Sequence, residues 1–328
     1  MTIQFINSWN RMGMPSLQEM NPNYVSPLEQ IQMRYQEIEY LRNLPPEEDE
    51  EPEINEPSQF DGIGSDKKYT VAVVDFCDDN SADIDLDGDG KADMAHGNVV
   101  ANLISSAFEN SDIFTFDISE TKKYTTNERM VASLQYIVEE IKSGECDYDA
   151  LNLSLSSRMT YADLSKALGV TINNDNVSQY ADKIKSWLHS TGAKNGYSTT
   201  SQVVKLLEEI EKLGTDVYIA AANVNDGSDD ELNLYSLVSG STTVGAKNKT
   251  GGVADFSFQN SLIDTWALGE IEVKKIKDGS GNLLGFDLNH DGEVDIDSKY
   301  SSGGTNSANA YLKGTSFATP YMIMQQLS

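Results

Sequence analysis

Residues 69–75 read Tyr-Thr-Val-Ala-Val-Val-Asp, a short apolar run rich in β-branched side chains that ends in a carboxylate. Apolar side chains at consecutive positions are typical of a strand buried on both faces. Working outward, we predict helices over 96–108, 126–142 and 200–213, and strands over 113–117, 150–155 and 217–222. Strands that alternate with helices in this way predict an α/β fold with a mostly parallel sheet flanked by helices.

The first 60 residues differ in composition from the rest. The stretch from Pro45 to Pro57 contains seven acidic residues and four of the eight prolines, so we interpret residues 45–60 as an extended acidic linker. Before it, Ser26-Pro27-Leu28-Glu29 is typical of a capped helix start, and apolar residues recur on one face as far as Leu41. Residues 1–44 are therefore a helical extension that packs on the main domain or a partner, or a pro-segment that covers a site.

Overall charge excludes some classes of partner. The chain has 52 acidic residues and 24 Lys and Arg, which gives a net charge of −28 and a pI near 4.3. Such a chain repels phosphate backbones and anionic membranes, so we expect no nucleic-acid or membrane partner. No apolar run approaches the roughly 20 residues of a membrane span, and residues 1–25 show no secretory leader.

Three residues form a candidate catalytic set. Asp75 ends the first strand, His96 begins a predicted helix and is one of only three histidines, and Ser316 stands in Gly-Thr-Ser-Phe-Ala-Thr-Pro, residues 314–320. Each alone has a structural interpretation, as a turn former, a helix residue or a cap. Their order along the chain, Asp then His then Ser, is one of the known orders of a serine-protease triad.

Six sequence blocks extend this comparison. The blocks follow one another along the chain in this order: VAVVD (71–75), HGNVVANLI (96–104), LNLSLSS (151–157), AAANVND (220–226), VADFSFQNS with WALG (253–261 and 266–269) and GTSFATP (314–320). They resemble the corresponding blocks of the subtilisin-like serine proteases. The resemblance implies a three-layer subtilisin-like fold over residues 61–328, with an insertion at about 158–198.

The resemblance also implies roles for individual residues. Ser316 is then the nucleophile, His96 the base and Asp75 the residue that orients it, in an endopeptidase that forms an acyl-enzyme on a polypeptide substrate. Asn223 is the expected second oxyanion donor, with Asn225 as the alternative if the loop is shifted. Ser154, Leu155, Ser156 and Ser157 match the strand that pairs with the substrate backbone.

Two acidic loops have the spacing of calcium-binding sequences. Asp85, Asp87, Asp89 and Asp93 fit D-x-D-x-D-G-x-x-D, and Asp287, Asn289, Asp291 and Asp295 fit D-x-N-x-D-G-x-x-D. Alternating oxygen ligands around a glycine suit Ca²⁺, although neither loop has the final glutamate of an EF-hand. The simpler interpretation is a pair of solvated turns. Calcium sites would favour an extracellular or exported protein.

Three functions follow from these observations. The first is an active serine endopeptidase. The second is a weak or inactive subtilase that binds peptides or a partner in a calcium-dependent way, since Val99, Asn102 and Lys313 depart from the family pattern. The third is a calcium-binding structural or adhesion protein.

Overall fold

The computed structural model describes residue 60 and residues 62–108, 110–224, 229–301 and 310–328. The predicted N-terminal helical extension, 1–44, lies outside the described residues. So does the acidic linker, apart from Phe60 at its end.

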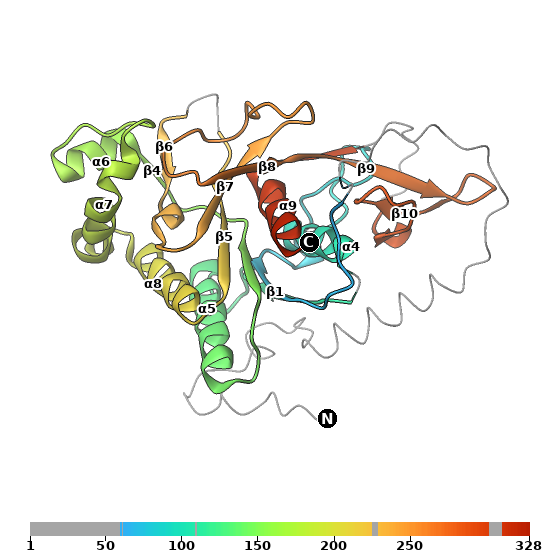
Figure 1. Ribbon diagram of the computed structural model, residues 1–328, viewed down its shortest axis with the longest axis horizontal. Coiled ribbons are helices and arrows are strands. Elements are labelled where there is room, and N and C mark those ends of the chain that lie inside the picture. The colour runs from blue at the N-terminus through green and yellow to red at the C-terminus, as the bar shows by residue number, and fades with distance from the viewer. Residues whose placement is uncertain (1–59, 61, 109, 225–228, 302–309) are drawn as a thin grey trace.

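A six-stranded parallel sheet forms the centre of the molecule (Figure 1). Its strands, in spatial order, are β2 (Asp112–Asp117), β1 (Thr70–Asp75), β3 (Ala150–Leu153), β5 (Asp216–Ala220), β7 (Thr242–Lys247) and β8 (Thr265–Leu268). Every neighbouring pair is parallel. The predicted α/β fold with a mostly parallel sheet is therefore confirmed.

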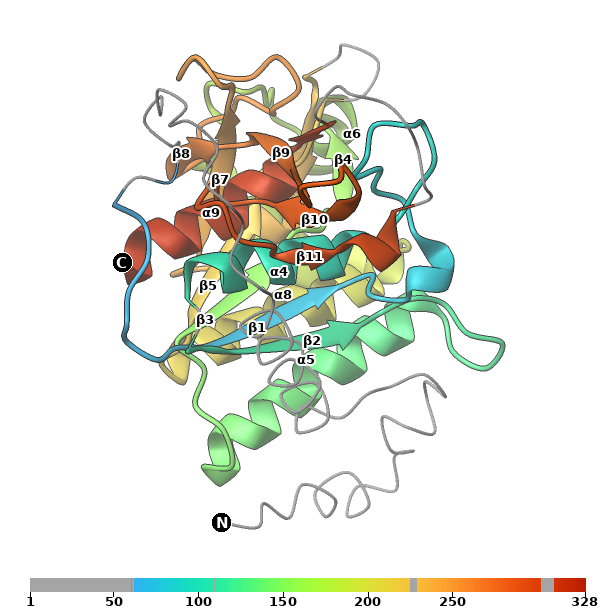
Figure 2. The same ribbon diagram turned by 90° about the vertical axis from the view of Figure 1, so that its right-hand side faces the viewer.

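Helices cover both faces of this sheet (Figure 2). On one face lie α5 (Thr126–Ser143) and α8 (Ser198–Lys212), and on the other α4 (His96–Ala107) and α9 (Thr315–Leu327). Strand β1 contributes side chains to the hydrophobic core on each side of the sheet. Ala72 and Val74 pack in the core under α5 and α8, and Val71 and Val73 pack in the core under α4 and α9. Alternate side chains of a strand point to opposite faces, so a sheet covered twice needs apolar residues at every position.

Two further regions surround the sheet. The first comprises the helices α6 (Tyr161–Leu168), η2 (Val177–Tyr180), α7 (Ala181–Trp187) and η3 (Leu188–Gly192), with the paired strands β4 (Arg158–Thr160) and β6 (Glu231–Asn233) and the turn η4 (Leu234–Leu237). Residues 177–192 thus form three consecutive short helical segments. The second region is an antiparallel sheet of β11 (Ile296–Asp297), β10 (Leu283–Asp287), β9 (Glu270–Lys277) and β12 (Ala310–Lys313), with the turn η5 (Ser298–Tyr300) directly after β11. Another short turn, η1 (Asp79–Ser81), follows β1. Across the described ranges, no helix has the length and apolar character to cross a membrane.

The carboxyl ends of the parallel strands bring the predicted site residues to one edge. Asp75 ends β1, residues 154–157 follow β3, and Asn223 comes soon after β5. Ligand sites of parallel α/β sheets lie at this edge, where polar side chains can leave the core.

Candidate active site

Asp75 and His96 lie in contact at the carboxyl-terminal edge of the parallel sheet. Asp75 is completely buried, and each of its carboxylate oxygens lies 3.0 Å from Nδ1 of His96. The backbone N–H of His96 donates to the Asp83 carboxylate. Burial, the largest single influence, lowers the pKa of His96, but the charge and hydrogen bond of Asp75 and the charge of Asp83 outweigh it and raise the pKa above 6.5. The contact with Asp75 fixes Nδ1 toward the carboxylate and leaves Nε2 for another partner.

Gly97 allows α4 to approach β1 this closely. A Cβ at this position would lie 2.7 Å from Cβ of Asp75, 2.6 Å from Sγ of Cys77 and 2.9 Å from the carbonyl oxygen of Phe76. Non-bonded carbon atoms prefer separations of about 3.5–4.0 Å. Any side chain at position 97 would therefore push His96 away from Asp75.

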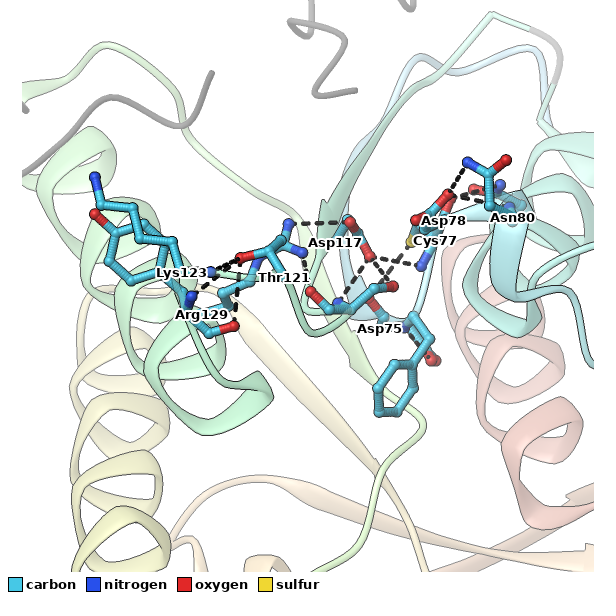
Figure 3. A network of polar contacts seen from close by, with 12 residues as sticks. Asp75, Cys77, Asp78, Asn80, Asp117, Thr121, Lys123 and Arg129 are labelled. Carbon is cyan, nitrogen blue, oxygen red and sulfur yellow. Dashed lines mark hydrogen bonds and ion pairs between the residues drawn. The ribbon is translucent and has the colours of Figure 1, made fainter. Parts of the chain in front are cut away.

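A buried ion pair supports the turn that follows Asp75 (Figure 3). Asp117 pairs with Asp75 in the sheet, accepts a 2.9 Å hydrogen bond from the backbone N–H of Cys77, and lies 3.0 Å from the guanidinium of Arg129. Arg129 is only 4 % exposed, so without this carboxylate its buried charge would lack a counterion. Sequence reasoning missed the pair, because only the fold brings the end of β2 to α5.

Ser316 is the second residue of α9, which lies beside α4 (Figures 1 and 2). The ring of the next residue, Phe317, has its centroid 5.5 Å from that of the His96 imidazole. The Ser316 hydroxyl donates to the backbone carbonyl of Ser154 at 3.3 Å, and the Ser154 hydroxyl donates to the carbonyl of Ser316 at 2.8 Å. The fold thus brings Ser316 near the Asp75–His96 pair, but within the described chain its hydroxyl is hydrogen-bonded to Ser154.

Asn223 lies beside the start of α9. Its Oδ1 accepts hydrogen bonds from the backbone N–H (2.9 Å) and the hydroxyl (3.1 Å) of Thr315. Its Nδ2 therefore faces Gly314, where an added Cβ would lie 3.2 Å from it. The residue before it, Ala222, has φ of 87°, a left-handed conformation that costs free energy for any residue with a Cβ. The alternative donor, Asn225, lies outside the described residues.

The predicted substrate-binding segment, 154–157, is held by Asn233. This completely buried amide donates to the carbonyls of Leu155 (3.1 Å) and Ala220 (2.8 Å) and accepts from the backbone N–H of Ser157 (3.0 Å) and of Tyr235 (3.1 Å). Asn233 thus ties the segment after β3 to the end of β5. The Ser157 N–H is used inside the protein, whereas the backbone of Ser156 has no hydrogen-bond partner within the described ranges.

The first acidic loop gathers three of its four predicted ligands. One carboxylate oxygen from each of Asp85, Asp87 and Asp89 lies within 4.8 Å of the others. Asp93 closes the loop, because its Oδ2 accepts from the backbone N–H groups of Leu86 (2.8 Å) and Asp87 (3.2 Å). Three carboxylates at this spacing can hold a metal ion, whose charge offsets their mutual repulsion.

The second acidic loop repeats the hydrogen bonds of the first. Asp287 accepts from the N–H groups of His290 (2.5 Å) and Gly292 (3.1 Å), three and five residues later, as Asp85 does from Gly88 and Gly90. His290 and Gly292 have positive φ, like the two glycines of the first loop. The two loops therefore share one backbone design.

Burial perturbs the carboxylates of the second loop. The pKa of Asp295 is raised to about 8, by burial above all and by the charges of Asp291 and Asp287, against the hydrogen bonds from Leu288 and Asn289. Burial also raises the pKa of Asp287. Asn289 joins this loop to the end of α4 by donating to the carbonyl of Ser106 at 2.8 Å. A bound cation would favour the ionised form of these buried acids.

Comparison with known proteins finds only distant likenesses. No family model matches the chain, and no curated protein matches its sequence. Among solved structures, the chain is similar to a lanthipeptide protease, with 15 % identity, coverage of 78 % of this chain and 71 % of that one, and a TM-score of 0.43. It is also similar to a cold adapted subtilisin-like serine proteinase (17 % identity, 85 % and 82 % coverage, TM-score 0.41) and to MycP1 from the ESX-1 type VII secretion system (15 %, 78 % and 67 %, 0.42). Likenesses this distant carry no argument about chemistry, which rests on the chain's own residues.

Proposed function

We propose that the chain is a subtilisin-like serine endopeptidase that hydrolyses peptide bonds through an acyl-enzyme intermediate. The observation that carries this proposal is the contact of His96 Nδ1 with both oxygens of the buried Asp75, next to the helix start that bears Ser316. A serine hydroxyl is a poor nucleophile near neutral pH unless a base lies within reach. An imidazole held at Nδ1 offers Nε2 as that base.

In the proposed reaction, His96 accepts and donates a proton twice, once while the acyl-enzyme forms and once while it is hydrolysed. Ser316 Oγ bonds to the scissile carbonyl carbon while its proton passes to Nε2 of His96. The imidazolium then gives this proton to the leaving amine as the C–N bond breaks, and Asp75 stabilises the imidazolium without being protonated itself. Water then attacks the ester carbonyl carbon and gives one proton to Nε2 of His96, which passes it to Ser316 Oγ as the C–O bond breaks and the carboxylic acid leaves.

Two donors are suited to the developing oxyanion. Asn223 Nδ2 has no acceptor among the described residues, because Thr315 engages only the amide oxygen. The backbone N–H of Ser316 is in the first turn of α9, where N–H groups lack helical partners. The free backbone of Ser156 suits pairing with an extended polypeptide substrate.

One contact favours the alternative, a weak or inactive subtilase that binds peptides or a partner. In the structure the Ser316 hydroxyl donates to the Ser154 carbonyl and not to His96. In an active enzyme, a substrate N–H that took this carbonyl would release the hydroxyl to the imidazole. In an inactive one, the hydroxyl would keep its present bond.

Labelling with a fluorophosphonate separates these two functions. We expect the folded, calcium-supplemented protein to form a covalent adduct at Ser316 and Ser316→Ala to form none. The exposed Ser190→Ala is the matched control and should label like the wild type. No adduct in the wild type would exclude the active peptidase.

For the acidic loops we propose Ca²⁺ as the bound ion. Asp85, Asp87, Asp89 and Asp93 would hold one ion and Asp287, Asn289, Asp291 and Asp295 another, since all these side chains offer the oxygen ligands that Ca²⁺ prefers. The first loop leads into α4, and Asp83 accepts from the N–H of His96. Bound Ca²⁺ would thus stabilise the position of the base.

Calcium titration followed by thermal unfolding tests these sites. We expect Ca²⁺ to raise the melting temperature of the wild type, and Asp89→Asn to lose part of this gain while the exposed Asp66→Asn keeps it. An equal gain in both variants would argue against the first site. If Ser316→Ala binds calcium normally and the wild type forms no adduct, a calcium-binding structural or adhesion role becomes the better assignment.

We also propose that residues 1–44 are a pro-segment tethered by the acidic linker, and that the protein acts outside the cytoplasm. Mass spectrometry of the purified wild type should then find cleavage before about residue 60. Ser316→Ala should remain whole. Cleavage in both would point to another protease.

A further inference from the structure

Arg158 lies beside the segment that is proposed to pair with the substrate. It is the first residue of β4 and comes two positions after Ser156, an exposed residue whose backbone has no hydrogen-bond partner within the described ranges. Nε of Arg158 donates to the Ser156 hydroxyl at 3.3 Å. After residue 60 the sequence has only one other arginine, Arg129, whose guanidinium is buried against Asp117. Arg158 is therefore the one partly exposed guanidinium of the described chain.

The same guanidinium contacts the support of the Asn223 turn. Cζ of Arg158 lies 5.3 Å from the centroid of the Phe258 ring, within the range of a cation–π contact. Phe258 is completely buried, packs in one small core with Ala222, and donates its N–H to the Ala222 carbonyl at 3.1 Å. Ala222 precedes Asn223, the proposed oxyanion donor. Arg158 thus contacts both the substrate segment and the support of the oxyanion donor.

The ion pair of Arg158 leaves part of its charge available. Oε2 of Glu231, in the neighbouring strand β6, lies 3.4 Å from Nη1. The two side chains are 24 % and 29 % exposed, so solvent weakens this pair. A guanidinium presents several N–H donors in a planar fork, and within the described ranges the contacts with Ser156 and Glu231 use only two of them. The others can bind a carboxylate that enters from solvent.

We propose that Arg158 makes the cleft selective for polypeptides with an acidic side chain close to the scissile bond. The selectivity rests on the proposed function, which places the polypeptide along residues 154–157. The carbonyl of Ser154 accepts from the Ser316 hydroxyl, so a strand paired with this segment passes Ser156 within about two residues of the carbonyl that Ser316 attacks. A guanidinium binds a carboxylate through charge-assisted hydrogen bonds, whereas glutamine offers one neutral acceptor.

The charge of the whole chain opposes this preference. A net charge of −28 attracts basic peptides and repels acidic ones over most of the surface. A preference for an acidic side chain therefore requires a local cation. Removal of Arg158 should then abolish the preference, while removal of a distant cation should not.

Peptide binding to Ser316→Ala tests the selectivity without turnover. The probes are two fluorescein-labelled peptides in an otherwise uncharged background, with either Glu or Gln at the central position, and anisotropy gives their dissociation constants. We expect Ser316→Ala to bind the Glu peptide about 10-fold more tightly, as a hydrogen bond between charged groups predicts. Adding Arg158→Gln should abolish the difference. Adding the exposed Lys194→Gln, which removes the same charge elsewhere, should preserve it.

Two more variants separate the charge of Arg158 from its place in the fold. Arg158 pairs with Asn233 in the β4–β6 ladder, so thermal unfolding first checks that each variant is folded. Arg158→Lys keeps the charge without the planar fork and should retain part of the preference. Glu231→Gln removes the competing carboxylate and should increase the preference. Equal Glu preference in Arg158→Gln and Lys194→Gln, no Glu preference in Ser316→Ala, or a smaller one in Glu231→Gln would overturn the proposal.

Hydrolysis of the same peptides by the wild type distinguishes this selectivity from the proposed activity. In an active peptidase, kcat/KM for the Glu peptide should exceed that for the Gln peptide by about the same 10-fold factor. Selective binding by Ser316→Ala without hydrolysis by the wild type would refute the peptidase and support the selectivity in a peptide-binding protein. Hydrolysis of both peptides with equal kcat/KM would refute the selectivity and support the peptidase.

Discussion

Replacing Gly97 with alanine tests whether the close approach of α4 to β1 sets the catalytic geometry. The new Cβ would lie 2.7 Å from Cβ of Asp75, whereas carbon atoms in contact stay about 3.5–4.0 Å apart. The helix start must therefore retreat by about 1 Å. Cys77 could rotate its sulfur away, but the Asp75 Cβ and the Phe76 carbonyl belong to the strand end and have no such freedom.

A retreat of this size would break the contact on which the proposed function rests. The 3.0 Å separation between His96 Nδ1 and the Asp75 carboxylate would grow to about 4 Å, beyond hydrogen-bonding distance. Misplacement of a catalytic group by about 1 Å costs about 100-fold in rate. Overpacking of a tight site costs a further ~1–3 kcal/mol of stability.

Fluorophosphonate labelling rates and peptide hydrolysis measure the first effect, and urea unfolding measures the second. Gly279→Ala is the matched control, because a Cβ at position 279 meets no atom within 4 Å and should leave both quantities unchanged. If Gly97→Ala reacted at the wild-type rate with unchanged stability, the geometric reasoning would be refuted.

Three further substitutions or conditions extend the test. Asn233→Ala should destabilise the protein by about 3–5 kcal/mol in urea unfolding, because four backbone groups, each buried or partly buried, lose their partner, whereas the exposed Asn195→Ala should have little effect. Ala222→Gly should raise stability by up to about 1 kcal/mol, since relief of the left-handed strain outweighs the added chain entropy; a loss of stability would contradict the φ of 87°. Because the pKa of His96 is raised, hydrolysis should fall as pH drops through a value above 6.5, and Asp75→Asn should move this inflection downward. The same shift contributes stability that is full below pH 6.5 and is lost as pH rises through the folded-state pKa, so a curve of the opposite sign would exclude the assigned pairing.

Most of the parallel sheet could be predicted because its signals are local. The run before Asp75 is apolar at every position, and it proved to be a strand with Ala72 and Val73 in different cores. The antiparallel sheet was not predicted. In β9, Ile271 and Val273 are buried while Lys274 and Lys277 are exposed, so charged residues interrupt the apolar pattern. Only the pairing with β10 and β12 makes this segment a strand.

The acidic loops could be predicted from the sequence, whereas the contacts of Asn233 could not, because the two differ in how far apart the bonded residues lie in the chain. Within the first loop, the hydrogen bonds from Leu86 and Gly90 join residues only seven and five positions apart, so the spacing of the aspartates is enough to define the turn. The bonds of Asn233 to Leu155 and Ser157 span 78 and 76 positions, and no local pattern records them. The bond from Ser316 to Ser154 spans 162 positions. Motifs could therefore identify the candidate nucleophile, but the partner of its hydroxyl depends on how α9 packs against the end of β3, which is a property of the folded chain.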